Sequence, residues 1–234
     1  MTDRYHVPEL TKASAGQVLT LPPDESSHAV RVMRIKPDAT ITLFSGRDEV
    51  ATATVVTADR RSVAVRVGQV IIDPNVPDAR VRVWAALPKP ERCKELVARL
   101  TELGVTTITP ILCERTQRPP SDNLLDKLRR GVVEACKQSR RNRLMEIQNP
   151  VAWSQVEPVR DELNWIAHPG GPPVQEVGEG PRCNVAIGPE GGFTDGEADR
   201  AVAKGWTPVG LGSRIYRIET AAVVMAALAV HRPR

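Results

Sequence analysis

Two glycine-bearing segments near the carboxyl end decide the fold: Ile187-Gly188-Pro189-Glu190-Gly191-Gly192-Phe193 and Leu211-Gly212-Ser213-Arg214-Ile215-Tyr216-Arg217-Ile218-Glu219-Thr220. Each follows a short apolar run that predicts a buried strand, at residues 184–187 and 208–211, and each leads into a helical pattern. The turns after the strands of an open α/β sheet gather at one edge, where such sheets bind ligands. Both segments are therefore expected to line one ligand site.

The glycine spacing excludes two common nucleotide-binding loops. Neither segment contains the G-x-G-x-x-G of a dinucleotide fold or the G-x-x-x-x-G-K-[ST] of a phosphate loop. Glycine still permits the close approach and positive φ angles that a ligand-binding turn needs. A plain strand-to-helix turn explains any single one of these glycines equally well, and it is the pair of turns that indicates a ligand site.

Strands and helices alternate through the second part of the chain. Besides the two strands above, the pattern predicts strands at 81–87, 105–111 and 163–167 and helices at 91–103 and 124–139. This alternation predicts a mostly parallel α/β sheet. Thr194-Asp195-Gly196-Glu197 fits a capping box that begins the next helix. The last helix, about 219–231, is nearly all small and apolar, which predicts burial in a core or against a second subunit.

The first 72 residues have a different pattern, with short alternating β-branched runs at 40–44, 50–57 and 62–72. Ser45-Gly46-Arg47-Asp48 predicts a hairpin turn, and residues 23–27 carry helix-start signals before a short helix at 28–33. These features predict a small β-barrel at 1–72. Two prolines in residues 73–79 predict a linker, which leaves 80–234 as the α/β domain.

Composition limits the classes of function. The chain has 234 residues, 41% of them hydrophobic, and no apolar run near the roughly 20 residues that span a bilayer. A cytoplasmic protein without a membrane partner is therefore expected. The four cysteines are widely spaced without a C-x-x-C pair, which predicts buried thiols and neither a metal site nor a disulfide framework. A covalent cysteine mechanism is not expected, because no cysteine lies in a glycine turn.

Positive charge is concentrated between Lys127 and Arg143, although the formal net charge of the chain is only +4. The segment carries seven basic residues against Glu134 alone: Lys127, Arg129, Arg130, Lys137, Arg140, Arg141 and Arg143. It predicts either a footprint for nucleic-acid phosphates or a solvated helix face. Aromatic residues make up only 3% of the chain, which argues against a binder that stacks single-stranded bases.

Together with Glu102-Leu103-Gly104-Val105 and Gln138-Ser139-Arg140-Arg141, the two glycine turns resemble the SPOUT, or trefoil-knot, methyltransferases. Within that class the chain is similar to the family that methylates N3 of a uridine in 16S ribosomal RNA. The similarity extends from about Arg4 to the carboxyl end. It implies S-adenosyl-L-methionine as cofactor, 16S rRNA of the small ribosomal subunit as partner, a deep trefoil knot in 80–234 and a homodimer through that domain.

The resemblance also covers the amino-terminal part. His28, the element Val32-Met33-Arg34 and Gly46 are similar to the pattern of the family's PUA-like RNA-binding barrel. The barrel at 1–72 is therefore expected to bind RNA.

The resemblance implies a set of cofactor-binding residues at the ends of the predicted strands. Backbone groups of Ile187, Leu211 and Ile215 are expected to contact the cofactor. The full set is Leu87, His168, Ile187, Gly188, Pro189, Glu190, Gly191, Gly192, Leu211, Gly212, Ile215, Tyr216, Arg217 and Thr220.

The implied reaction sets a chemical requirement for the catalytic residues. N3 of uracil carries a proton at neutral pH, so the site must remove that proton or stabilise negative charge on the base. Glu190 and Glu219 are the acids of the two motifs, and either one is a candidate base. Arg141 is expected on the substrate side, and Arg217 or Arg141 is expected to pair with a carboxylate or an RNA phosphate.

The RNA-binding residues implied by the resemblance are basic or amide side chains in both domains. They are Arg4, Arg34, Lys89, Arg92, Gln138, Arg140 and Arg141. Contacts of this kind position an RNA backbone and do not read its sequence. Lys89 and Arg92 also suit a role in capping a helix.

Other functions remain open from the sequence. A different knotted RNA methyltransferase, acting on a ribose 2′-oxygen or on guanine N1, shares the cofactor turns. A ribosome-assembly protein with an inactive pocket is a non-enzymatic alternative. A binder of double-stranded DNA is disfavoured, because no recognition-helix motif is present.

Overall fold

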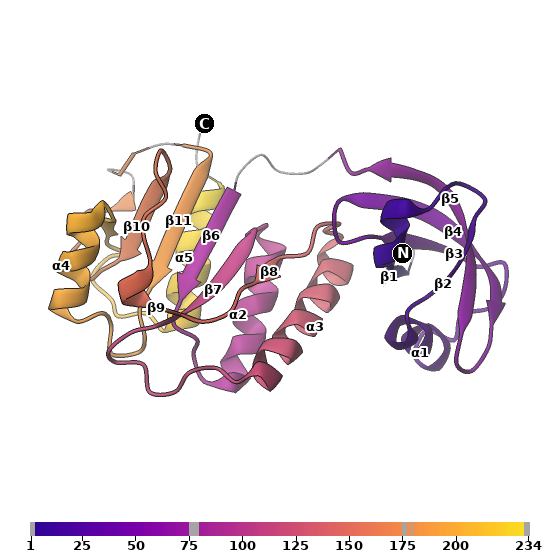
Figure 1. Cartoon of the computed structure of the whole chain (residues 1–234), viewed down its shortest axis with the longest axis horizontal. Coiled ribbons are helices and arrows are strands. Elements are labelled where there is room, and N and C mark those ends of the chain that lie inside the picture. The colour runs from indigo at the N-terminus through magenta and orange to yellow at the C-terminus, as the bar shows by residue number, and fades with distance from the viewer. Residues whose placement is uncertain (1–2, 75–79, 175–176, 179, 232–234) are drawn as a thin grey trace. The chain divides into compact units, whose positions relative to one another are not determined.

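The computed structural model describes residues 3–74, 80–174, 177–178 and 180–231 (Figure 1). The described residues form two compact units, 3–74 with 136–144, and 80–135 with 145–231. The sequence pattern placed 136–144 in the second domain, whereas the structure packs this segment with the first unit. Most of the predicted linker at 73–79 lies outside the described residues.

The first unit contains one five-stranded sheet with the order β1-β3-β4-β5-β2. Its strands are β1 (Arg4–His6), β2 (Val18–Thr20), β3 (Thr40–Phe44), β4 (Glu49–Ala58) and β5 (Val63–Ile72). The three predicted strands are confirmed within one residue at each end, whereas β1 and β2, each three residues long, gave no sequence signal. Alternate side chains of β4 and β5 are buried, and they fill the core of this unit.

Two helical segments accompany the sheet, the 3-10 helix η1 (Pro8–Lys12) and α1 (Pro23–Arg31). The predicted helix at 28–33 is therefore wrong in its bounds. Pro23 occupies the first helical position, where a proline costs no hydrogen bond, so the helix begins five residues earlier than expected.

Residues 136–144 are attached to the first unit by polar contacts. Arg143 pairs with Asp48, and Lys137 Nζ lies 3.1 Å from Glu25 Oε2. Asn142 accepts a hydrogen bond from Arg4 and donates one to Asp73 Oδ2 at 2.7 Å. The guanidinium of Arg4 also lies over the Phe44 ring. Charge pairs of this kind determine where the Gln138-to-Arg141 segment lies on the unit.

The second unit is built on a seven-stranded sheet with the order β12-β10-β11-β6-β7-β8, and β9 pairs with β7. Its strands are β6 (Arg80–Ala85), β7 (Thr107–Leu112), β8 (Glu146–Ile147), β9 (Val151–Ala152), β10 (Leu163–Ala167), β11 (Arg182–Ile187) and β12 (Thr207–Val209). Every pairing in this sheet is parallel, which confirms the predicted sheet type. The carboxyl ends of these strands therefore lie at one edge.

The helices of the second unit are α2 (Pro90–Glu102), α3 (Asp122–Ser139), whose end belongs to the first unit, α4 (Asp195–Lys204) and α5 (Ile218–Val230), with a short 3-10 helix η2 (Trp153–Gln155). The capping box at Thr194 and Glu197 is confirmed. α5 packs on β6, β11 and α2, and Figure 1 shows it behind those strands. One of its faces is buried, while Val223, Val224, Ala227 and Leu228 are only partly buried. The knot itself stays a prediction from the family resemblance.

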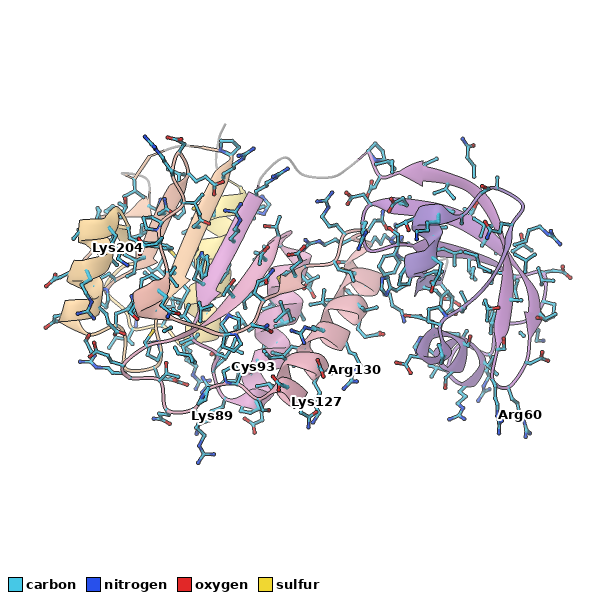
Figure 2. The ribbon with its side chains drawn as sticks, viewed as in Figure 1. Arg60, Lys89, Cys93, Lys127, Arg130 and Lys204 are labelled. Atoms are coloured by element: carbon cyan, nitrogen blue, oxygen red, sulfur yellow. The ribbon has the colours of Figure 1, made fainter. Side chains whose placement is uncertain are left out.

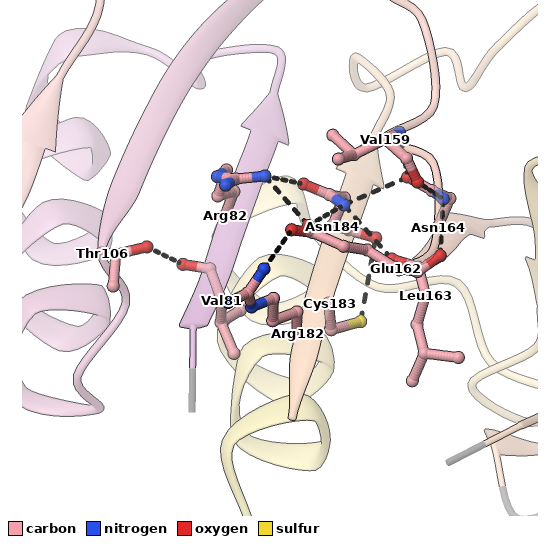
Figure 3. A network of polar contacts seen from close by, with 10 residues as sticks. All are labelled: Val81, Arg82, Thr106, Val159, Glu162, Leu163, Asn164, Arg182, Cys183 and Asn184. Carbon is pink, nitrogen blue, oxygen red and sulfur yellow. Dashed lines mark hydrogen bonds and ion pairs between the residues drawn. The ribbon is translucent and has the colours of Figure 1, made fainter. Parts of the chain in front are cut away.

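A row of polar side chains crosses the central strands (Figure 3). Arg82, Asn184 and Asn164 are direct neighbours on β6, β11 and β10. Arg82 Nη1 donates to Glu162 Oε2 at 2.9 Å, and Asn184 Nδ2 donates to the same oxygen at 3.0 Å. The adjacent row, which includes Trp165, is apolar and buried. A slip by one residue would exchange the polar and apolar faces, so the network fixes the register of β11.

Within the described residues, no helix is long and apolar enough to cross a membrane. All four cysteines, Cys93, Cys113, Cys136 and Cys183, are free and buried, as the sequence predicted.

Gly46 is expected to be much less replaceable than Gly16 in the same unit. It has a φ of +85°, and a Cβ placed there would lie 2.9 Å from both His6 Nε2 and Leu144 Cγ. Gly16 has a nearly identical φ of +84°, but a Cβ there would meet no atom within 4 Å. Gly46→Ala should therefore cost about 2 kcal/mol more unfolding free energy than Gly16→Ala, measured by chemical denaturation. Equal losses would show that His6 and Leu144 move aside freely.

Candidate active site

A cavity of about 380 Å³ lies at the carboxyl ends of β10, β11 and β12. Both glycine segments line it, which confirms that the two turns share one edge of the sheet. The volume is in the range of small-molecule sites, about 300–1,000 Å³. The lining residues are Arg115, Ala167, His168, Pro169, Ile187, Gly188, Pro189, Glu190, Gly191, Gly192, Phe193, Asp195, Val209, Leu211, Gly212, Arg214, Ile215, Tyr216, Ile218 and Ala221.

The first glycine loop is folded tightly upon itself. The Gly192 N–H donates to the Pro189 carbonyl at 2.8 Å, and Gly192 has a φ of +71°. A Cβ on Gly188 would lie 3.0 Å from the Phe193 backbone nitrogen and 3.2 Å from the Gly192 carbonyl carbon. Phe193 packs against Trp153, with ring centroids 5.0 Å apart. A side chain at position 188 would thus displace the loop as well as fill space.

The second glycine loop begins where two backbones approach closely. A Cβ on Gly210 would overlap the Gly171 carbonyl oxygen, and the Gly210 N–H donates to the Pro172 carbonyl at 2.9 Å. Gly212 follows with a φ of +95°. Beyond it the segment turns outward, since Ile215 is 95% exposed. An apolar side chain this exposed beside a cavity is available to a ligand or partner.

The structure brings most of the predicted cofactor residues together around this cavity. They are His168, Ile187, Gly188, Pro189, Glu190, Gly191, Gly192, Leu211, Gly212, Ile215 and Tyr216. Leu87, Arg217 and Thr220 are absent from the lining. Leu87 is half-buried beyond β6, Arg217 is the exposed residue that precedes α5, and Thr220 is exposed in the first turn of α5.

The two candidate bases share one arginine. Arg92 Nη1 donates to Glu219 Oε1 at 3.1 Å, and Arg92 Nη2 lies 3.6 Å from Glu190 Oε1. Glu190 lines the cavity and its side chain is 49% exposed, whereas the Glu219 side chain is 12% exposed. Sequence patterns assigned Arg92 to RNA phosphate or to a helix cap, and they missed its pairing with both motif acids.

The two arginines expected to pair with a carboxylate or an RNA phosphate, Arg141 and Arg217, do not line the cavity. Within the described residues, Arg217 has no carboxylate within ion-pair distance. Arg141 belongs to the first unit and does not line the cavity. Burial lowers the pKa of the Arg141 guanidinium, and Arg143 lowers it further. A guanidinium titrates so far above neutral pH that Arg141 keeps its charge.

Arg115 is a lining residue that sequence reasoning missed. Its Nη1 donates to the Gly191 carbonyl at 2.6 Å and contacts the Phe193 carbonyl at 3.4 Å. Arg115 follows β7, so it reaches the loop from the carboxyl end of a neighbouring strand. That position was a usable signal, because residues after parallel strands share the ligand-binding edge. Next to it, the Glu114 N–H donates to Glu197 Oε1, which links β7 to the start of α4.

The predicted RNA-binding residues fall into two groups. Arg34, Lys89, Gln138 and Arg140 are exposed, and Lys89 extends away from the start of α2 in Figure 2. Arg4 and Arg92 are already engaged by Asn142 and by the two acids, respectively. Lys127 and Arg130 of the basic segment project outward from α3 (Figure 2). The RNA-binding roles stay predictions.

The thiols are unsuited to nucleophilic catalysis. Burial raises the pKa of Cys93 to about 11 and that of Cys113 to about 12, so both remain protonated at neutral pH. No cysteine lines the cavity described above. Among the described residues, no three His, Cys, Asp or Glu side chains are grouped closely enough to hold a metal ion.

Comparison with known proteins identifies the family. The RNA methyltransferase domain family matches residues 75–230, and the RNA methyltransferase PUA domain family matches residues 21–68. Ribosomal RNA small subunit methyltransferase E of Aquifex aeolicus is 30% identical over 219 residues, covering 91% of this chain and 94% of that relative. The chain belongs to the ribosomal RNA small subunit methyltransferase E family. The family member from Synechocystis sp. is 38% identical over 156 residues, so the match spans 63% of this chain and about half, 52%, of that relative.

Solved structures of similar proteins share the fold over nearly the whole chain. A methyltransferase from Legionella pneumophila, solved with bound cofactor SAM, has a TM-score of 0.91, 30% identity and coverage of 98% of this chain and 97% of its own. The small subunit methyltransferase E of Neisseria gonorrhoeae, bound to S-adenosyl methionine, has a TM-score of 0.90 and 25% identity. That match covers 97% of this chain and 96% of that protein's chain. The fold is therefore that of the methyltransferase E family, with a PUA domain before the α/β domain.

Arg115 is expected to stabilise the first glycine loop. Arg115→Met removes the hydrogen bonds to Gly191 and Phe193 but keeps the aliphatic stem. Amide hydrogen exchange across residues 189–193 should rise by about fivefold, because a lost hydrogen bond costs about 1 kcal/mol. Arg99→Met is the control, since Arg99 is exposed and pairs with Glu95 of its own helix. Unchanged exchange in Arg115→Met would mean that the Phe193 packing and the Gly192–Pro189 hydrogen bond hold the loop without Arg115.

Proposed function

We propose that the protein transfers a methyl group from S-adenosyl-L-methionine to N3 of a uridine in 16S rRNA of the small ribosomal subunit, in the cytoplasm. The main observation that supports this proposal is that both glycine segments line one cavity at the carboxyl edge of a parallel sheet. Relatives matched over most of this chain carry the name of the small subunit enzyme, and two similar structures hold the cofactor. These relatives support this function over the other knotted methyltransferases.

The cavity suits S-adenosylmethionine in size and chemistry. Glycines at 188, 191, 192 and 212 line the cavity without side chains, so that an adenine can approach the backbone, and Ile187, Leu211 and Ile215 provide apolar surface. Glu190 and Asp195 provide negative charge for a cationic ligand, while Arg115 and Arg214 provide positive charge for its carboxylate. When bound, the cofactor supplies an electrophilic methyl group on a sulfonium. The chain must then make the acceptor nitrogen nucleophilic.

The first unit is proposed to hold the RNA. Exposed Arg34 and Arg140 suit phosphate contacts, and Gln138 and Arg141 lie on the segment that Asp48 and Asp73 attach to this unit. Arg141 is proposed to stabilise negative charge on the uracil ring during transfer. The glycines and apolar side chains that line the cavity are proposed to bind the cofactor.

A homodimer through the second unit is also proposed. Val223, Val224, Ala227 and Leu228 of α5 are only partly buried, although the helix carries no charge between Glu219 and its end. A second copy would cover this apolar face. A dimer mass in light scattering, lost in Val224→Lys, would support it; a monomer mass for the unaltered protein would refute it.

The function is tested by incubating the protein with radiolabelled S-adenosylmethionine and small ribosomal subunits that lack the modification. Mass spectrometry of the nucleosides should then identify N3-methyluridine in 16S rRNA. A methylated ribose or guanine would instead assign another reaction. Cofactor binding without transfer to any RNA would favour the assembly-factor alternative.

Gly188→Val should weaken cofactor binding, because the side chain displaces Phe193 and Gly192 of the loop. We expect the Kd for S-adenosylmethionine, measured by calorimetry, to rise at least about tenfold, or ~1.4 kcal/mol. Gly131→Ala in α3 is the control, since a Cβ there meets no atom within 4 Å. An unchanged Kd in Gly188→Val would remove this loop from the cofactor site.

Arg141→Ala should strongly reduce transfer without affecting cofactor binding, because Arg141 lies outside the cavity lining. We expect kcat/KM for the RNA to fall by at least about a hundredfold, the usual cost of losing one charge-stabilising donor. The Kd for S-adenosylmethionine should stay within about twofold. Full activity in Arg141→Ala would assign the substrate role to another arginine.

A further inference from the structure

Arg92 connects the two glycine segments through their acids. It lies in the first turn of α2, between Glu190 of the first loop and Glu219 at the start of α5. The three elements are distant in sequence, and no other described residue forms ion pairs with both segments. Two carboxylates face one guanidinium, so the group carries a formal charge of −1.

The two acids are held differently. Both oxygens of Glu219 accept hydrogen bonds from Arg92 Nη1, at 3.1 and 3.2 Å, and the side chain is nearly buried. Glu190 has only the 3.6 Å ion pair with Nη2, is half-exposed, and lines the cavity. Glu219 therefore fixes the guanidinium, whose second amino group is directed at Glu190. The acid that reaches the cavity is the weakly held one.

We propose that Arg92, anchored by Glu219, is a positioning residue that holds the Glu190 carboxylate at the cavity, where Glu190 accepts the N3 proton of the acceptor base. This inference rests on the proposed function. A half-exposed glutamate samples several rotamers, and the ion pair restricts it to those directed at the reacting nitrogen. Glu219 acts only through Arg92, because it does not line the cavity.

The proton and electrons balance in this step. The N3–H bond breaks, its proton passes to a Glu190 oxygen, and the electron pair stays on N3. That pair forms the bond to the methyl carbon as the bond between that carbon and sulfur breaks, with its electrons remaining on sulfur. Glu190 afterwards returns the proton to water. The paired acids also offset the electrostatic cost of an arginine close to a sulfonium.

A double-mutant cycle tests the arrangement on the full-length protein. Arg92→Met should lower kcat for methyl transfer about a hundredfold, the size of a general-base contribution, and should raise the Kd for S-adenosylmethionine by a much smaller factor. In a Glu190→Gln background the same substitution should change kcat less than about twofold, because its target is already lost. Arg92→Lys should restore part of kcat, since lysine keeps the charge but lacks the two-pronged guanidinium.

Loop exchange provides a readout independent of activity. Arg92→Met and Glu219→Gln should both raise amide hydrogen exchange across residues 188–193, and Arg92→Lys should raise it less. Arg99→Met, on the same helix, should leave it unchanged. Unchanged exchange in Arg92→Met would overturn the positioning role.

The remaining outcomes separate this inference from the proposed function. If the reductions in kcat caused by Arg92→Met and Glu190→Gln multiply in the double variant, the two residues are not coupled and this inference is overturned. The proposed methyl-transfer function would be unaffected by that result. A raised KM for RNA with unchanged kcat in Arg92→Met would make Arg92 a phosphate contact instead. Absence of transfer by the unaltered protein would overturn the proposed function and the base assignment together.

Discussion

The parallel pairing of β11 between β10 and β6 is the constraint on which the rest of the second unit depends. β11 ends at Ile187, so the first glycine loop must begin at the carboxyl edge of the sheet. The Arg82, Asn184, Asn164 and Glu162 network fixes the strand's register, and the apolar row on the opposite face packs in the core. A different register would move Gly188 relative to the strands that enclose the cavity.

The cavity is lined by the residues that come directly after the neighbouring strands at that edge. β10 leads to His168, β12 leads to Leu211 and Gly212, and β7 leads to Arg115. The glycines permit the tight turn at 188–193, and the packing of Phe193 on Trp153 and the hydrogen bond from Arg115 hold that turn in place. A rigid loop of this kind is preorganised for a ligand, which reduces the entropic cost of binding.

In both units, acidic side chains pair with the basic residues near the proposed sites. The acids Glu190 and Glu219 share Arg92 in the second unit, while Asp48, Asp73 and Glu25 hold the Lys137-to-Arg143 segment in the first. The basic segment that suggested a phosphate footprint is thus partly neutralised by the unit it packs on. Arg140 remains exposed there, with a φ of +61°.

The sequence by itself determined the elements that local patterns encode. Alternating and periodic runs predicted β3, β10 and α5, the capping box predicted the start of α4, and the paired glycine turns predicted a ligand site at one edge of a parallel sheet. These features depend on side-chain periodicity and backbone freedom within a few residues.

Only the tertiary structure decided which distant residues meet. It assigned Arg92 to Glu190 and Glu219, brought Arg115 to the glycine loop, and packed residues 136–144 with the first unit. An ion pair between residues about a hundred positions apart leaves no local pattern, because its partners are set by strand order and helix packing. The short strands β1 and β2 escaped prediction for the same reason, since pairing with β3 and β5 defines them.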